Sequence, residues 1–157
     1  MVPWCSAAVA VGFYTCPERR MKIDKAIIYT DGASRGNPGP AAIGVVIKDG
    51  QGKVLARISR RIGRTTNNQA EYRAIIAALE EASRLGVARV ELKSDSELAV
   101  KQIVGRYRVK NQALRPLHQR VRELQSLFQS LTIAYIPRRQ NAEADRLSNA
   151  ALDAAVD

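Results

Sequence analysis

The chain has 157 residues, of which 46% are hydrophobic and only 5% aromatic, and its formal net charge is +10. This length predicts one domain with an aliphatic core, and the basic balance favours a partner with a phosphate backbone. The apolar run 7–11 is too short to span a membrane, and no basic residue precedes it as in a secretory signal. We therefore expect a cytoplasmic monomer with no membrane contact.

Residues 1–21 differ in composition from the rest of the chain. They contain Trp4, the only tryptophan, and both cysteines, Cys5 and Cys16. No histidine accompanies the cysteines, which disfavours a zinc site, and a disulfide would need an oxidising compartment. We interpret 1–21 as a dispensable N-terminal extension, or else as a small apolar flap packed on the domain. Residues 22–157 are predicted to form the domain itself.

Within 22–157 the hydrophobic pattern alternates between strand and helix. Pro38-Gly39-Pro40 indicates a loop, and residues 49–52 (DGQG) are typical of a hairpin turn. Strands are predicted at 25–30, 42–48, 53–62, 88–94 and 131–136. Helices are predicted at 67–85, 96–104, 114–128 and 142–155. The order βββαβααβα indicates an α/β fold with a mixed five-stranded sheet and helices packed on it.

Four carboxylates fall at the ends of these elements. Asp31 and Asp95 each end a predicted strand, and Glu71 and Asp145 lie in the predicted first turns of two helices. Taken singly, an acid at a helix start compensates the helix dipole, and Asp31 before a glycine suits a turn. Taken together, two strand ends and two helix starts can converge on one point, where their repulsion requires divalent cations. Such a site in a basic chain points to phosphodiester chemistry.

Four short motifs carry a family resemblance. Residues 30–40 (TDGASRGNPGP) and 65–72 (TTNNQAEY) resemble the first two signatures of type 1 ribonuclease H, and they are specific. Residues 94–96 (SDS) and 141–145 (NAEAD) are similar to the third and fourth, and would be weak alone. The match keeps order and spacing from about residue 25 to 151.

The resemblance implies hydrolysis of the RNA strand of an RNA/DNA hybrid, leaving 5′-phosphate and 3′-hydroxyl ends. It implies two Mg²⁺ or Mn²⁺ ions per site, which clamp the attacking and leaving oxygens. Asp31 would bridge both ions. Asp145 would help to hold the ion that activates water. Glu71 and Asp95 would hold the ion at the leaving oxygen.

The resemblance also implies substrate contacts. Asn37, Asn67 and Asn68 would meet 2′-hydroxyls or base edges in the minor groove, with Gln69 nearby. Alternatively, Asn67 and Asn68 only cap the long helix. A DNA-phosphate pocket would consist of Arg64, Thr66 and Asn111.

The chain departs from many relatives in two places. The loop 135–141 lacks the histidine that relatives carry there, and Arg138 or Arg139 is expected to act on phosphate charge instead. A guanidinium stays protonated and cannot shuttle a proton. The only histidine, His118, is interpreted as a helix-surface residue. The connection 104–114 is too short for the basic extra helix that other relatives use to grip the hybrid, which predicts weaker, more salt-sensitive binding.

Several other functions fit parts of the pattern. Compact relatives sometimes also cut double-stranded RNA. A non-catalytic module that binds hybrid or double-stranded RNA would keep the fold, but all four acids are present. A transposase core or an exonuclease is disfavoured by Asn67-Asn68 before Glu71. A structural Ca²⁺ site is disfavoured because no loop has consecutive ligand spacing.

Overall fold

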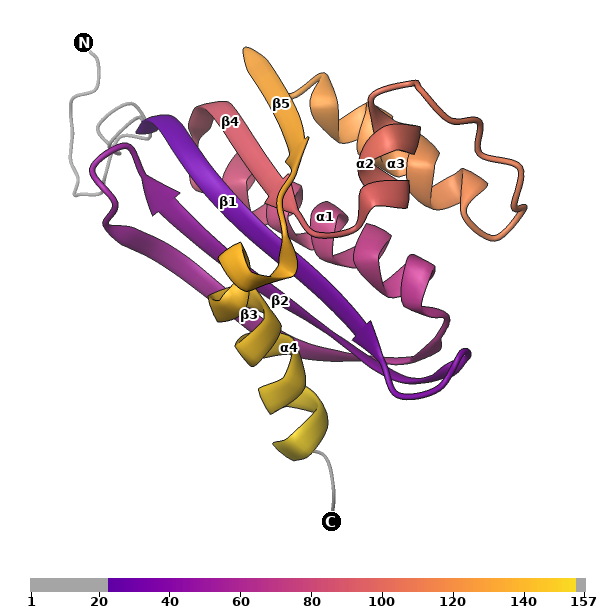
Figure 1. The fold of residues 1–157 in the computed structure, drawn as a ribbon. Coiled ribbons are helices and arrows are strands. Elements are labelled where there is room, and N and C mark those ends of the chain that lie inside the picture. Colours follow the sequence, from indigo (N-terminus) through magenta and orange to yellow (C-terminus); the bar gives the residue numbers. More distant parts are fainter. Residues whose placement is uncertain (1–22, 155–157) are drawn as a thin grey trace, which may run out of the picture.

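The computed structural model describes residues 23–154, which form a five-stranded sheet (Figure 1). The strand order is β3-β2-β1-β4-β5, with β1 antiparallel to β2, β2 antiparallel to β3, and β1, β4 and β5 parallel. The strands are β1 (Ile23–Ser34), β2 (Gly39–Asp49), β3 (Val54–Thr65), β4 (Val87–Ser94) and β5 (Ser130–Tyr135). The predicted mixed sheet is confirmed.

Helices cover both faces of the sheet. Three of them contact one another on one face, and the last packs against β1, β2 and β3 on the other, in front of the sheet in Figure 1. The helices are α1 (Asn67–Arg84), α2 (Glu97–Ile103), α3 (Arg115–Gln125), the 3₁₀ turn η2 (Arg138–Gln140) and α4 (Ala142–Ala154). None of the described helices is both long and apolar enough to cross a bilayer. The predicted extension 1–21 lies outside the described residues.

The first strand is longer than its sequence pattern predicts. β1 continues four residues past Thr30, and Asp31 is paired with Gly44 of β2 inside the sheet. The interpretation of Asp31 as a turn residue is therefore wrong. The predicted loop at Pro38-Gly39-Pro40 is shorter as well, because β2 begins at Gly39. Small residues on both strands allow this pairing to continue where no apolar alternation is visible.

The main core lies between the sheet and α1. It is aliphatic, as expected from the low aromatic content, and each fully buried side chain of this size contributes about 1.5–3 kcal/mol. Its fully buried members include Ile28, Val45, Ile47, Tyr72, Ile75, Leu79 and Leu92.

Two glycines let the helices touch the sheet next to Asp31. A Cβ on Gly32 would lie 2.2 Å from the backbone carbon of Ala70 in α1. A Cβ on Gly44 would lie 2.1 Å from the carbonyl oxygen of Ala144 in α4. Both approaches are closer than van der Waals contact allows, so these positions exclude any side chain and bring two helices to Asp31 from opposite faces.

Replacement of Gly44 by alanine is expected to destabilise the fold. The methyl group would meet helix backbone, which moves less easily than a side chain, and overpacking of this kind costs about 1–3 kcal/mol. Urea unfolding would measure the loss. Gly50→Ala is the matched control, since a Cβ there has no neighbour within 4 Å. Equal stability of the two variants would contradict the close approach of α4.

Candidate metal and active site

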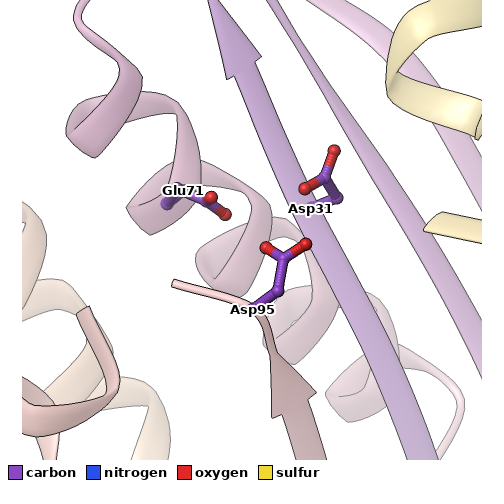
Figure 2. Close-up of side chains that lie close together, drawn as sticks. All are labelled: Asp31, Glu71 and Asp95. Atoms are coloured by element: carbon purple, nitrogen blue, oxygen red, sulfur yellow. The ribbon is translucent and has the colours of Figure 1, made fainter. Parts of the chain in front are cut away.

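Three of the four predicted acids meet at one point. Asp31, Glu71 and Asp95 each offer a carboxylate oxygen, and these oxygens all lie within 4.8 Å of one another. Figure 2 shows the three side chains pointing toward one another from β1, α1 and the end of β4. All three are nearly buried, with exposed fractions of 2% for Asp31, 5% for Glu71 and 3% for the Asp95 side chain.

The cluster forms where β4 stops beside a longer β1. Ser94, the last residue of β4, pairs with Thr30, so β1 continues past Thr30 without a β4 neighbour. The N–H of Gly32 donates instead to Oε1 of Glu71 at 3.0 Å. Glu71 is the fifth residue of α1, beyond its first turn, so its interpretation as dipole compensation is wrong.

Asp145 lies apart from this group of three. It is in the first turn of α4, as predicted, and its carboxylate Oδ1 accepts from Nδ2 of Asn149 at 3.3 Å. Its charge nevertheless raises the pKa of Asp31, after the larger effects of burial and of Asp95.

Two further residues, for which the sequence predicts no role in the site, hold it in place. Ser148 is fully buried, and its hydroxyl lies 2.6 Å from Oδ2 of Asp31, to which it donates. It follows Asp145 by three residues, so a helical wheel of α4 places it on the same face. Asn141 is buried and its Nδ2 donates to the carbonyl of Thr30, the last residue of β1 that pairs with β4, at 2.8 Å.

Burial and mutual repulsion make the cluster resist ionisation. Burial, followed by the charges of Asp95 and Asp145, raises the pKa of Asp31 to about 7, although the Ser148 hydrogen bond opposes the rise. Burial and the charges of Asp31 and Asp95 raise the pKa of Glu71 well above its usual value. A divalent cation would relieve both effects, because carboxylate oxygens are its preferred ligands.

An unsatisfied oxygen supports the fit to a cation. Oδ2 of Asp95 is buried and accepts no hydrogen bond within residues 23–154. The nearest cationic group is Nε of Arg138, 3.8 Å away on a side chain that is 78% exposed. Since a buried carboxylate oxygen without a partner is costly, the donor set of Asp31, Glu71 and Asp95 fits a hard metal ion.

The start of α1 leaves two asparagines free for other contacts. The N-cap is Thr66, whose Oγ1 accepts from the Gln69 N–H at 3.2 Å, while Oε1 of Gln69 accepts from the Thr66 N–H at 2.9 Å. This reciprocal capping box means that Asn67 and Asn68 are not the cap, so that alternative is wrong. Both are exposed, and Oδ1 of Asn37 accepts from the Asn67 N–H at 3.0 Å.

The remaining predicted contact residues lie on the surface or on loops. Arg64, Asn111, Arg138 and Arg139 are exposed, and Asn111 Oδ1 accepts from the Ala113 N–H at 2.8 Å. The connection 104–114 contains no further helix, as expected.

His118 is not the helix-surface residue that the sequence predicts. It is partly buried, its Nε2 lies 3.1 Å from the Gln102 carbonyl, and its ring packs edge-on to Tyr72. The reason is that His118 shares the buried face of α3 with Leu114 and Val121, four residues before it and three after.

Comparisons with known proteins agree with this geometry. A family model described as "Reverse transcriptase-like" matches residues 29–151. The crystal structure of RNase H1 from *Halobacterium salinarum* has 48% identity and a TM-score of 0.82, over 83% of this chain and 99% of that one. This chain belongs to the ribonuclease HI family. The curated ribonuclease HI of the same archaeon is 50% identical over 125 residues, which is 80% of this chain.

Other members extend the comparison. The bifunctional protein Rv2228c of *Mycobacterium tuberculosis* is 45% identical over 84% of this chain. LC11-RNase H1, solved in complex with an RNA/DNA hybrid, has 45% identity and a TM-score of 0.80, over 84% of this chain and 99% of that one. This chain spans 63% of the length of the curated *Halobacterium* relative and 36% of the mycobacterial one. The predicted fold and family are both confirmed.

Proposed function

We propose that this protein is a metal-dependent endoribonuclease that hydrolyses the RNA strand of RNA/DNA hybrids, leaving 5′-phosphate and 3′-hydroxyl ends. The observation that carries the proposal is the group of three buried carboxylates with raised pKa values at Asp31 and Glu71. Membership of the ribonuclease HI family and the hybrid bound to LC11-RNase H1 support the substrate. The net charge of +10 suits a phosphate backbone.

The proposed cofactors are two Mg²⁺ or Mn²⁺ ions. When bound, such ions activate the attacking water and stabilise the charge on the leaving 3′ oxygen. Asp31 would contribute to both ions, since its carboxylate lies with those of Glu71 and Asp95 and its pKa also responds to the charge of Asp145. Glu71 and Asp95 would hold one ion and Asp145 would help to hold the other. Ser148 keeps the Asp31 carboxylate in one orientation through its 2.6 Å hydrogen bond.

Asparagine side chains would read the minor groove. Asn37 uses its Oδ1 on the α1 backbone, which leaves its amide N–H groups free to donate to a 2′-hydroxyl. Asn67 and Asn68 are exposed beside it and take no part in the helix cap. These three residues would distinguish ribose from deoxyribose close to the acidic cluster.

Phosphate contacts would come from exposed basic and polar residues. Arg64, Thr66 and Asn111 are the proposed DNA-phosphate pocket, and Arg138 and Arg139 would contact the RNA strand. Arg138 is well placed because its guanidinium lies beside Asp95 but is mostly exposed. A monomeric state and a cytoplasmic location remain predictions.

The test of this function is a substrate panel. End-labelled RNA/DNA hybrid, double-stranded RNA and double-stranded DNA are incubated with the full chain and Mg²⁺ or Mn²⁺. We expect the RNA strand of the hybrid to be cut and the DNA duplex to survive. Cutting of double-stranded RNA would widen the substrate class. Binding of hybrid without cleavage in either metal would refute an enzyme and leave a recognition module.

Replacement of Arg138 by glutamine is expected to weaken hybrid binding in a salt-dependent way. Loss of one phosphate contact reduces the slope of log K against log salt by about 1. Fluorescence anisotropy in EDTA measures the slope without cleavage. Lys53→Gln removes one charge at the hairpin end of the sheet, away from the acids, and should leave the slope unchanged. Equal slopes for both variants would exclude Arg138 from the interface.

A further inference from the structure

A second group of basic side chains surrounds Tyr29, on the side of the sheet that carries α4. Tyr29 precedes Asp31 by two residues on β1, so both side chains point to the same face. Lys48 of β2 and Lys93 of β4 place their Nζ atoms 5.5 and 5.8 Å from the centre of the Tyr29 ring. The ring thereby contacts two ammonium groups through cation–π interactions, one from the strand on each side of β1.

A hollow of about 210 Å³ opens beside this ring. It is lined by Tyr29, Lys48, Arg139 and the residues that lead into α4. Beyond it α4 covers β1, β2 and β3, whereas Lys93, Thr132 and Ala134 on β4 and β5 keep accessible surface. A ligand in the hollow would therefore have an open path along the sheet.

The positive charge around the hollow is only partly neutralised. Glu143 is the one carboxylate among the lining residues; Arg57 contacts it at 3.0 Å, and Lys48 is farther away at 3.7 Å. Lys93 and Arg139 form no ion pair within the part of the chain that the structure describes. The one carboxylate at the hollow thus already has a closer partner than Lys48, and Lys93 and Arg139 are unpaired among the described residues, which favours an anionic ligand.

The hollow lies next to the acidic cluster. The Cα atoms of Tyr29 and Asp31 are roughly 7 Å apart along an extended strand, a distance comparable to the spacing of neighbouring phosphates along one strand of a duplex. The turn η2 connects the two places, because Arg138 lies beside Asp95 and the next residue, Arg139, lines the hollow. A strand held at the acids would meet the hollow within a short distance.

We propose that Tyr29, Lys48, Lys93 and Arg139 form a further phosphate subsite, which binds a backbone phosphate of the RNA strand next to the cleaved bond. This inference rests on the proposed function for the identity of the strand. Lys48, Lys93 and Arg139 supply the charge, and Tyr29 keeps the two lysine side chains over the sheet. Such a subsite would add affinity where the chain lacks the basic extra helix.

The test compares hybrids of two lengths in EDTA, where binding is measured by anisotropy without cleavage. One hybrid fills only the acidic site, and in the others the RNA strand extends by a few nucleotides at its 5′ or its 3′ end. We expect the extension on one side to tighten binding to the wild-type chain. Lys93→Gln should remove most of that gain and lower the salt slope by about 1 for the extended hybrid only. The double variant Lys48→Gln with Lys93→Gln should lower the salt slope further.

The matched control is Lys25→Gln. Lys25 lies on the same strand and face as Tyr29 but farther from Asp31, and it is paired with Glu91 at 2.7 Å. Its replacement should leave the gain from extension intact. Equal effects of Lys93→Gln and Lys25→Gln, or no gain from either extension, would overturn the subsite. A different result would refute the proposed function: the wild-type chain with Mg²⁺ would bind the hybrid but not cut it.

Discussion

Replacing Asp31 by asparagine is expected to reduce hybrid cleavage about 10³-fold or more, which corresponds to a loss of about 4 kcal/mol of transition-state stabilisation. Asp31 belongs to the group of three carboxylates and also responds to the charge of Asp145, and its replacement removes a charged ligand from that group. Asparagine has the same shape, and its Oδ1 still accepts the Ser148 hydrogen bond. Single-turnover cleavage of end-labelled hybrid measures the loss.

Asp24→Asn is the matched control for Asp31→Asn. Asp24 lies on the same strand, its side chain is 73% exposed, and it pairs with Arg89 outside the acidic cluster. The control should cleave at the wild-type rate. Activity within tenfold of wild type in Asp31→Asn, with the fold shown intact by circular dichroism, would remove Asp31 from the proposed mechanism.

Replacing Glu71 by glutamine is expected to stabilise the metal-free protein at pH 8 while it abolishes cleavage. Burial and the charges of Asp31 and Asp95 raise the pKa of Glu71 in the folded state, so folding favours its protonated form. Glutamine is neutral at every pH, and its Oε1 can still accept the Gly32 N–H. The variant therefore avoids a repulsion that the wild-type chain carries without its cations.

The sign of this effect depends on pH. A carboxyl group whose pKa is raised on folding favours the folded state below its unfolded pKa and loses that contribution as the pH rises through the folded value. For Asp31 this window runs from 3.8 to about 7, and Glu71 shifts in the same direction. The wild-type chain and Glu71→Gln should be equally stable near pH 4. At pH 8 the variant should have a free energy of unfolding higher by at least about 1 kcal/mol, which raises the melting temperature by about 3 °C.

Thermal unfolding in EDTA from pH 4 to pH 8 tests this expectation. Addition of Mn²⁺ at pH 8 should raise the melting temperature of the wild-type chain more than that of Glu71→Gln. A variant that is less stable than wild type at pH 8 in EDTA would show that Glu71 contributes to the fold as a charged group. Removal of the repulsion would then not be the dominant effect of the substitution.

Most of the fold follows from sequence patterns that have a local cause. Alternation of apolar residues predicts the strands, and alanine-rich or amphipathic runs predict the helices, all in the right order. The ends of elements are less predictable because they depend on partners distant in sequence. β1 extends to Ser34 since β2 pairs with it there, and no pattern within β1 reports that pairing.

The residue types of the site and their convergence were predictable from the sequence, but the contacts that bring them together were not. Asp31, Glu71 and Asp95 meet because Gly32 admits α1 against β1, which depends on a tertiary contact. The cap of α1 was predictable from Thr66 and Gln69, because their spacing is that of a capping box. The place of Ser148 beside the site was predictable from its spacing to Asp145. The contact of Asn141 with Thr30 was not predictable, because it depends on where β4 ends beside β1.

The central claim is that the acidic cluster cuts the RNA strand of a hybrid only when it holds divalent cations. The most direct test is the rate of hybrid cleavage by the full chain as Mg²⁺ is increased from EDTA at constant ionic strength. We predict no cleavage in EDTA and a rate that rises with Mg²⁺ to a plateau, with products that carry 5′-phosphates. Cleavage that persists in EDTA would contradict the account, because repelling carboxylates without cations cannot carry out this chemistry.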